Sequence, residues 1–283
     1  MEFNFNGKTG KMTVYGSTKE CNGQNFHLID KKEIKEIEIQ EGIEKILDKS
    51  FMNCVNTTKI SLPSTLKSVG KFAFYSCGKL EELIFPTNVE SLEEDLFVNC
   101  TNLERVILPK NISNLPKKLF ENRTNLKLVS LPEKIEVIPE MCFKDCYNLQ
   151  QIKLPKSLKV IDENAFALCL SLEEIEIPEN VEKIERNAFN YCNKLKTIKF
   201  NGAVNDIDFS ALDNCASLKT ILVPVNTDIR ILEKLLEKHP QIKVKKYNKF
   251  YENLNTTDVD EIEYLRQRWI EQKVKKYNNE HTK

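Results

Sequence analysis

The feature that most constrains this chain is a 23-residue unit that recurs through most of its 283 residues without insertion or deletion. One copy, Leu172–Lys194, reads LEEIEIPENVEKIERNAFNYCNK. Eight full copies begin at Ile34, Thr57, Leu80, Leu103, Leu126, Leu149, Leu172 and Leu195. A ninth begins at Leu218 and loses the pattern before its end. Self-similarity at a fixed period of about 20–30 residues is typical of solenoids, so we expect one elongated domain.

Each unit combines a short strand pattern with apolar positions that only a neighbouring copy can cover. Positions 1, 4 and 6 are apolar, as in Leu172, Ile175 and Ile177. A Pro at position 7 ends the strand in most copies, because proline has no amide donor for a ladder. Position 18 is Phe in seven copies: Phe51, Phe74, Phe97, Phe120, Phe143, Phe166 and Phe189. Stacked copies are expected to bury these rings in one column, with strands about 4.8 Å apart.

Cysteine occupies position 21 in seven copies, and a buried column of small apolar side chains explains this spacing. The residues are Cys54, Cys77, Cys100, Cys146, Cys169, Cys192 and Cys215. A disulfide framework is one alternative, but seven is an odd number, and Cys21 and Cys142 stand outside the column. A zinc site is another, but only Cys142 and Cys146 are closely spaced and no His lies near them. We therefore expect no metal and no cofactor.

The composition excludes several classes of partner. Lysine and arginine number 42, as do aspartate and glutamate, so no net charge attracts nucleic acid or an anionic membrane. No window of 18 apolar residues predicts a membrane span, and the N-terminus lacks the apolar segment of a signal peptide. Nine cysteines without such a signal favour reduced thiols. We expect a cytoplasmic protein, with export to the cell surface by a non-classical route as the alternative.

Both ends of the repeat array carry patterns that predict caps, which a solenoid needs because its terminal units have an uncovered apolar face. Glu2–Asn6 and Lys11–Tyr15 alternate apolar and polar residues and predict a β-hairpin within an N-terminal cap, residues 1–33. Residues 34–244 then form the solenoid, closed by a helix at Asp228–Lys238 and a last strand at Gln241–Lys245. Residues 245–283 form a charged tail.

The tail carries the pattern of one amphipathic helix. Thr257 or Asp258 can cap a helix that runs to about Lys276. Its apolar stripe consists of Val259, Ile262, Leu265 and Trp269. Such a helix can bind a partner, or it can fold back on the last repeat or extend into solvent as a tail.

The consensus LxxIxIPxxVxxIxxxAFxxCxx resembles the BspA-type (Treponema pallidum-type) leucine-rich repeat, over about residues 34–224. Leu149–Ser171 and Leu172–Lys194 match it best. The resemblance implies an α+β repeat fold, a right-handed curved leucine-rich repeat solenoid with a parallel concave sheet. It also implies relatives that bind host proteins or cells from the surface, and others without export signals. The family carries no catalytic residues to transfer.

The outer face of the predicted sheet contains an apolar group in a polar setting. If positions 1, 4 and 6 point inward, positions 2, 3 and 5 point outward, which places Ile84 beside Ile107 and Leu128 near both. Charged residues, including Glu82 and Arg105, surround them. An apolar centre with a charged rim is typical of protein-binding patches. The alternative is that β-branched residues stand there for strand propensity.

Further along the same face, charged positions extend the candidate surface. They are Lys153, Glu174, Glu176 and Lys199. Their alternating signs also fit a solvated charge ladder between neighbouring strands, which is the structural alternative to partner binding.

Sequence motifs for catalysis are absent. No nucleophile–base motif, zinc-binding H-E-x-x-H or phosphate loop occurs, and the three histidines, His27, His239 and His281, lie outside the repeats. We predict a non-enzymatic protein–protein interaction module that binds its partner on the concave face. The alternatives are a BspA-like surface or secreted adhesin without a recognised signal, and an adaptor that acts through its tail helix.

Overall fold

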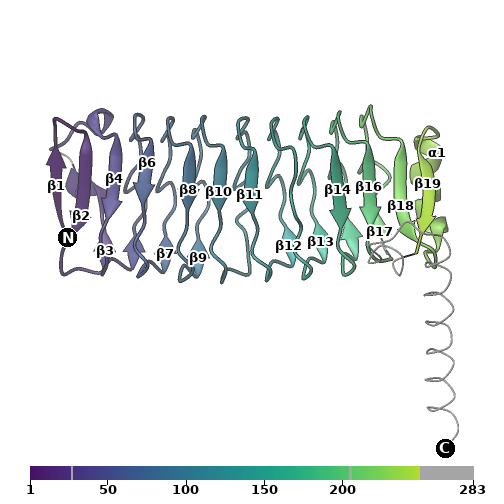
Figure 1. Ribbon diagram of the computed structural model, residues 1–283, viewed down its shortest axis with the longest axis horizontal. Helices are drawn as coiled ribbons and strands as arrows, with labels where there is room; N and C mark the ends of the chain where they lie inside the picture. Colours follow the sequence, from purple (N-terminus) through teal and green to yellow (C-terminus); the bar gives the residue numbers. More distant parts are fainter. Residues whose placement is uncertain (27, 204–205, 249–283) are drawn as a thin grey trace, which may run out of the picture.

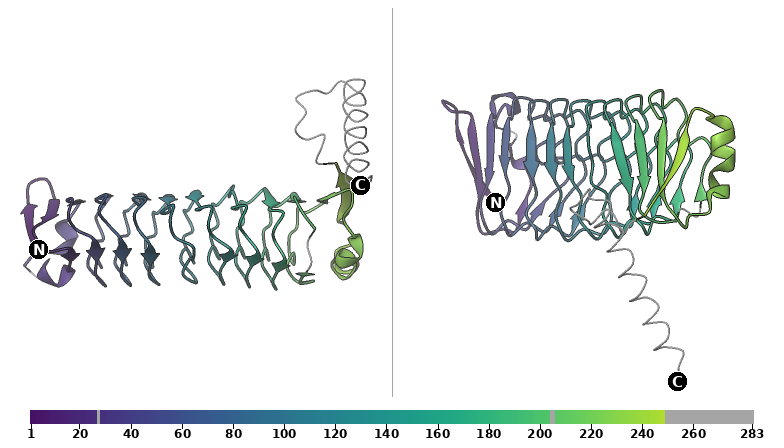
Figure 2. Two further views of the ribbon diagram at one scale, coloured as in Figure 1. Left: turned by 90° about the horizontal axis from the view of Figure 1, so that it is seen from below. Right: turned by 45° about the vertical axis from the view of Figure 1, so that its right-hand side comes forward.

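The computed structural model describes residues 1–26, 28–203 and 206–248, and these form one elongated array in which each turn of chain lies beside the next (Figures 1 and 2). The predicted leucine-rich repeat solenoid is therefore confirmed. In the part of the chain that the structure describes, no helix is long and apolar enough to cross a bilayer. The tail helix predicted at 257–276 lies outside the described residues, and the division into segments 1–33, 34–244 and 245–283 stays a prediction.

The longer strands lie on one side of the array, here called the strand face, and come from positions 3–6 of the repeat (Figure 1). Neighbouring strands are parallel and offset by 23 residues, so that Val106 lies opposite Leu83 and Val129. The pairing order is β2-β4-β6, then β8-β10-β11, then β14-β16-β18-β19. These strands are β4 (Glu36–Ile39), β6 (Lys59–Ser61), β8 (Glu82–Ile84), β10 (Arg105–Ile107), β11 (Leu128–Ser130), β14 (Glu174–Ile177), β16 (Thr197–Phe200), β18 (Thr220–Pro224) and β19 (Lys243–Tyr247).

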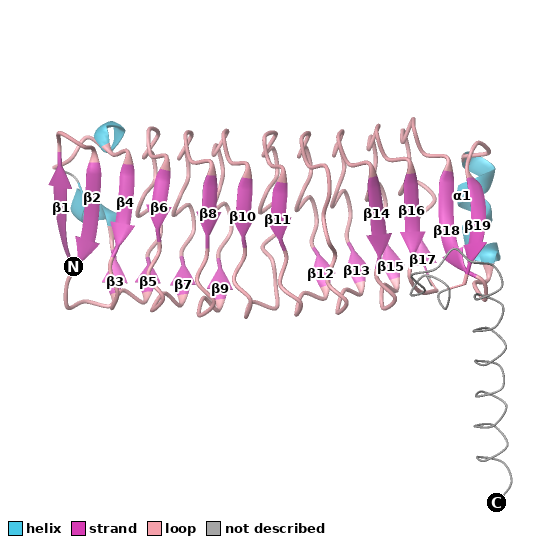
Figure 3. Cartoon of the chain, viewed as in Figure 1, coloured by secondary structure: helices cyan, strands magenta, loops and turns pink. Residues whose placement is uncertain are grey.

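A second row of two-residue strands forms at positions 12 and 13 (Figure 3). It comprises β3 (Glu20–Cys21), β5 (Lys45–Ile46), β7 (Ser68–Val69), β9 (Ser91–Leu92), β12 (Val137–Ile138), β13 (Val160–Ile161), β15 (Lys183–Ile184) and β17 (Asp206–Ile207). Helices pack about 8–10 Å apart, whereas strands pair at about 4.8 Å. Opposite the strand face, short strands and turns take the place that helices would occupy. The spacing between successive copies is therefore similar on both sides of the array, and the array is only slightly curved (Figure 2).

The core consists of columns of equivalent side chains, as the repeat predicts. The Phe rings from Phe26 to Phe189 are fully buried and stack with centroids 5.2–6.3 Å apart. Burial of one such ring contributes about 1.5–3 kcal/mol. Phe26 belongs to the N-terminal segment, so the column begins one turn before the first full copy.

The cysteines form a second column beside the rings. All nine are buried and free. Six of them place Sγ 3.1–3.4 Å from the carbonyl oxygen of the Phe in the preceding copy, where the thiol can donate a weak hydrogen bond. Burial raises the pKa of Cys54 and of Cys100 to about 12. The thiols are thus core residues, and the described residues contain no group of three potential ligands that could hold a metal ion.

Arg123 replaces cysteine in one copy and keeps the same acceptor. Its Nη1 donates to the carbonyl of Phe97, and its Nε donates to the carbonyl of Glu121 at 3.0 Å. The residue is 5% exposed, and burial lowers the pKa of its guanidinium. A positive charge therefore lies inside an otherwise apolar column.

Seven of the eight full copies close through two residues in the left-handed region, at positions 16 and 20. Lys49 and Asn53 have φ values of 58° and 68°, and the same pair recurs along the array. Asparagine tolerates this conformation, but Leu168 adopts it too, at φ 62°. A left-handed conformation costs a residue such as leucine about 1–2 kcal/mol.

The N-terminal cap contains the predicted hairpin. β1 (Glu2–Asn6) and β2 (Lys11–Tyr15) are antiparallel, and β2 pairs in parallel with β4. Two short 3₁₀ helices, η1 (Gly23–Phe26) and η2 (Lys31–Glu33), complete the segment before the first full copy.

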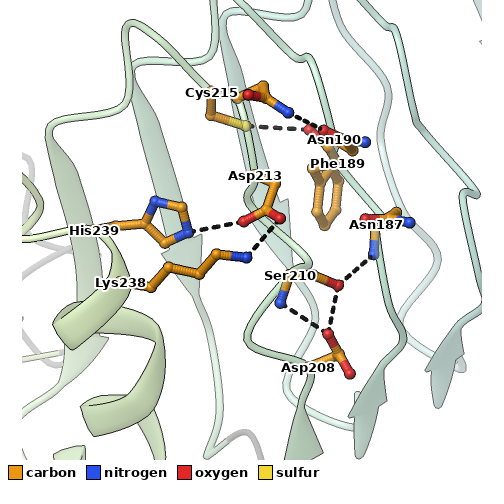
Figure 4. Close-up of polar contacts among 10 residues, drawn as sticks. Asn187, Phe189, Asn190, Asp208, Ser210, Asp213, Cys215, Lys238 and His239 are labelled. Atoms are coloured by element: carbon orange, nitrogen blue, oxygen red, sulfur yellow. Dashed lines mark hydrogen bonds and ion pairs between the residues drawn. The ribbon is translucent and has the colours of Figure 1, made fainter.

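The C-terminal cap consists of η3 (Ile229–Leu232), α1 (Glu233–Lys238) and β19. The helical turn and the strand were both predicted, although the strand lies at Lys243–Tyr247 rather than Gln241–Lys245. Polar side chains join the cap to the last full copy (Figure 4): Asp213 Oδ2 lies 2.6 Å from Lys238 Nζ, and Asp213 Oδ1 lies 3.2 Å from His239 Nε2.

Candidate partner-binding face

Two isoleucines lie next to each other on the strand face, as the repeat predicts. Ile84 of β8 and Ile107 of β10 are register partners in a parallel ladder. Their strand neighbours Leu83 and Val106 point into the core and are fully buried. Ile84 is 52% exposed and Ile107 is half-buried. The alternation places both isoleucine side chains outward, where no interior residue covers them.

Leu128 extends this group by one strand. It lies opposite Arg105 in the β10–β11 ladder, and Arg105 lies opposite Glu82. Leu128 is 45% exposed and is the diagonal neighbour of Ile107 on the same face. Ile84, Ile107 and Leu128 are called the apolar patch from here on.

Ion pairs between neighbouring strands frame the apolar patch. Arg105 Nη1 lies 2.9 Å from Glu82 Oε1, and Lys127 Nζ lies 2.8 Å from Glu104 Oε2. Both pairs are exposed, so each contributes about 0.2–1 kcal/mol at most to stability. Their effect is to hold charged groups at fixed places around an apolar centre.

Four charged residues were predicted further along the strand face. All of them line one open hollow of about 650 Å³. Lys153, Glu174, Glu176 and Lys199 all contribute to it. Lys199 Nζ lies 3.4 Å from Glu176 Oε1 and 5.5 Å from the centre of the Tyr247 ring. Within residues 1–26, 28–203 and 206–248, Lys153 and Glu174 form no ion pair. A charge ladder between strands therefore accounts for Glu176 and Lys199, but not for Lys153 and Glu174.

The strand face is interrupted beside this hollow. Residues 151–154 carry the usual repeat pattern but form no strand, and within the described chain no backbone hydrogen bond joins them to β11 or β14. Sequence reasoning missed this opening, since Gln151-Ile152-Lys153-Leu154 follows the same alternation as its neighbours. The hollow also takes in Lys156, Glu179 and Asn201, which the sequence did not single out.

Over the described residues, the strand face presents aliphatic side chains, hydroxyl groups, carboxylates and ammonium groups. Of the three histidines, His239 is the one that the structure describes, and it contacts Asp213 at the C-terminal cap.

Comparison with known proteins identifies this repeat. The profile of the BspA type leucine rich repeat region, six copies long, matches residues 25–149 and 114–243. A leucine-rich repeat protein from Bacteroides ovatus is similar in structure, with a TM-score of 0.64 and 27% identity over 76% of this chain. The chain spans 55% of that protein's length.

A leucine-rich repeat protein from T. pallidum matches over 60% of this chain and 87% of its own, with a TM-score of 0.47 and 19% identity. No curated protein sequence matches the chain significantly.

Proposed function

Because the chain belongs to the BspA type leucine rich repeat family, we propose that it is a non-enzymatic module that binds a partner protein on its strand face. Leucine-rich repeat proteins are typically binding modules, since stacked repeats present one long surface. The described part of the chain offers such a surface over nine strands.

The apolar patch is the observation that carries this proposal. Side chains such as Ile84 and Leu128, about half exposed, leave apolar area in contact with water beside fixed charges. Covering that area with a partner is favourable by about 25 cal/mol per Å². The Arg105–Glu82 pair at its edge would then select partners by charge complementarity.

The hollow extends the proposed footprint. From β8 to β16 the strand face advances by five strand spacings, or about 24 Å. A standard interface covers about 800 Å² on each partner, and a footprint of this length fits that size. Lys153 and Glu174, which have no ion pair in the described residues, supply one charge of each sign for groups on the partner.

Substitution of both isoleucines tests the proposal. Ile84→Asp with Ile107→Asp should abolish capture of the partner in an affinity purification followed by mass spectrometry. Both side chains point outward, so the circular dichroism spectrum should not change. Val137→Asp is the matched control, because Val137 is 38% exposed and belongs to β12, on the other row of strands. Undiminished capture by the double variant would reject the apolar patch as the site.

The cytoplasm is the compartment that we propose for this activity, on the grounds that all nine cysteines are free and buried. The rival function is a surface adhesin exported without a recognised signal. Labelling of intact cells with a membrane-impermeant reagent separates the two, since a labelled protein would require export. Deletion of residues 249–283 tests the tail adaptor: capture that persists without the tail would reject it.

A further inference from the structure

The C-terminal end of the strand face lacks the charge balance found elsewhere on that face. Through most of the array, a basic residue pairs with an acidic one at the same position of the preceding copy. Lys127 Nζ lies 2.8 Å from Glu104 Oε2, and Lys196 Nζ lies 2.8 Å from Glu173 Oε2. Such pairs keep the face close to neutral over its central copies.

This pattern ends after Lys196. Lys219 follows Lys196 itself at the same position, with its amide bonded to the carbonyl of Lys196 at 3.2 Å. Lys245 follows Leu222 in register, and Lys243 follows a threonine. These last three lysines are exposed and, within the described chain, make no ion pair. No outward residue of β16, β18 or β19 is an acid.

An apolar side chain lies among these lysines. Leu222 is half-buried and is the register partner of Lys199 on one side and Lys245 on the other. The group Lys219, Leu222, Lys243 and Lys245 is called the basic end. It fits an acidic segment that also contains apolar residues, because carboxylates would neutralise the lysines while an aliphatic side chain covers Leu222.

The chain itself contains such a segment directly after the last described strand. Residues 250–265 contain no lysine or arginine. They contain five acids: Glu252, Asp258, Asp260, Glu261 and Glu263. Val259 and Ile262 alternate with these acids. The described chain ends at Asn248, one residue beyond β19, which carries two of the lysines.

We propose that residues 258–263 bind the basic end of the same molecule. The nine residues 249–257 give a tether with a root-mean-square span of about 15–18 Å if it is flexible. The basic end measures about 5 Å across the adjacent strands β18 and β19 and about 10 Å along them, from Lys219 to Leu222. A short tether gives an effective concentration of about 1 mM, so weak exposed ion pairs can hold the segment. This contact is independent of the apolar patch.

Zero-length carbodiimide crosslinking of the full-length chain tests the contact, because it joins a lysine to a carboxylate only when the two touch. We expect crosslinks from Lys219, Lys243 or Lys245 to the four acids of residues 258–263, identified by mass spectrometry. A mixture of ¹⁴N- and ¹⁵N-labelled chains distinguishes the occupants. Crosslinks within one isotope support the proposal, whereas crosslinks mainly between isotopes would assign the site to a second copy and overturn it.

Charge reversal supplies the second arm of the test. The triple variant Lys219→Glu, Lys243→Glu and Lys245→Glu should reduce crosslinks from Lys246, the exposed lysine that remains in β19, to the same acids by at least about fivefold. The substituted positions cannot report, because they no longer carry an amine. For the natural chain, 1 M salt should reduce the crosslinks from Lys219, Lys243 and Lys245 by a similar factor. Lys35→Glu with Lys59→Glu is the matched control, since both lysines are exposed near the other end of the array.

A charge swap completes the design. Adding Asp258→Lys, Asp260→Lys, Glu261→Lys and Glu263→Lys to the lysine-reversed chain should restore the crosslinks with the chemistry inverted. Failure to restore them, or tail crosslinks spread equally over Lys35 and Lys59, would overturn the proposal.

Discussion

The centre of the array and its C-terminal end are stabilised in different ways. In the centre, each turn repeats the same contacts: Phe166 and Phe189 stack at 5.4 Å with an interplanar angle of 1°, and Cys192 Sγ lies 3.2 Å from the carbonyl of Phe166. At the end, Leu212 replaces Phe, and the cap is joined to it by single polar contacts such as Asp213 with Lys238.

This difference shows what repetition achieves. A residue in the centre has an equivalent on both sides, so one solution to packing and hydrogen bonding serves every copy. The end has an equivalent on one side only and must satisfy its polar groups individually. Among the described residues, the buried Thr227 Oγ1 lies there without a hydrogen bond, and the buried Asp213 Oδ1 and His239 Nε2 have only their mutual contact at 3.2 Å.

The largest effect that we expect is at the centre of the Phe column. Phe143 is fully buried and stacks on Phe120 at 5.3 Å and on Phe166 at 5.2 Å. Phe143→Ala should reduce the free energy of unfolding by about 3–5 kcal/mol, because the cavity would be enclosed by well-packed turns on both sides. Urea denaturation followed by circular dichroism measures it.

Phe209→Ala is the control for that loss. Phe209 is 52% exposed and contacts Lys238 Nζ at 5.1 Å from its ring centre, so its removal should cost about 1 kcal/mol or less. Similar losses for the two variants would contradict the distinction between a buried column and an exposed ring.

Arg123 tests the contrast between the repetitive centre and the C-terminal end. It is a buried charged side chain that occurs in one copy of an otherwise repeated apolar column. Arg123→Cys should increase the free energy of unfolding by about 1–4 kcal/mol. The substitution removes a buried charge, and its thiol can reach the carbonyl of Phe97 as Cys100 reaches that of Phe74 at 3.1 Å. Chemical denaturation under reducing conditions measures the change.

Arg123→Ala separates the two contributions to this effect, since it removes the charge but leaves the carbonyl of Phe97 without a donor. It should therefore be less stable than Arg123→Cys. If the cysteine variant is instead less stable than the natural chain, the guanidinium is a required part of the column.

At the C-terminal end, Thr227→Val should increase the free energy of unfolding by about 1 kcal/mol. Thr227 is 8% exposed, its Oγ1 has no hydrogen bond, and it borders a small apolar cavity lined by Phe200, Val223 and Leu232. Valine has nearly the same shape without the buried hydroxyl, whose desolvation costs about 1–3 kcal/mol.

Hydrogen–deuterium exchange of residues 229–247 localises that gain, because slower exchange should appear in the cap before it appears in the centre. Thr57→Val is the matched control. Thr57 is fully buried and its Oγ1 donates to the carbonyl of Ile34 at 2.9 Å, so the same change should destabilise the chain there. Equal signs for the two variants would contradict the role of the missing hydrogen bond.

The smallest effect concerns the turns. Leu168→Asn should increase the free energy of unfolding by about 0.5–1 kcal/mol, because asparagine adopts the left-handed conformation at lower cost. Asn164→Leu, at the other left-handed position of the same copy, should cost a similar amount. Thermal unfolding compares the two, and a stabilised Asn164→Leu would contradict the explanation.

Much of the candidate site followed from alternation along the strands. Ile84, Ile107 and Leu128 lie outward as predicted, because side-chain direction in a strand depends only on position. The opening at residues 151–154 could not be predicted, since it depends on how two neighbouring copies approach each other. For the same reason, the sequence alone did not distinguish Glu176, which pairs with Lys199, from Glu174, which has no ion pair in the described chain.

By itself, the sequence determined the repeat length, the buried columns and the hairpin before the first full copy. Those features follow from which residues are apolar at a fixed spacing, and each copy repeats the same information. Only the tertiary structure decided the slight curvature, the interruption of the strand face and the choice of ion pairs. These depend on distances between residues 23 or more positions apart, where differences of about 1 Å separate a bonded pair from two solvated groups.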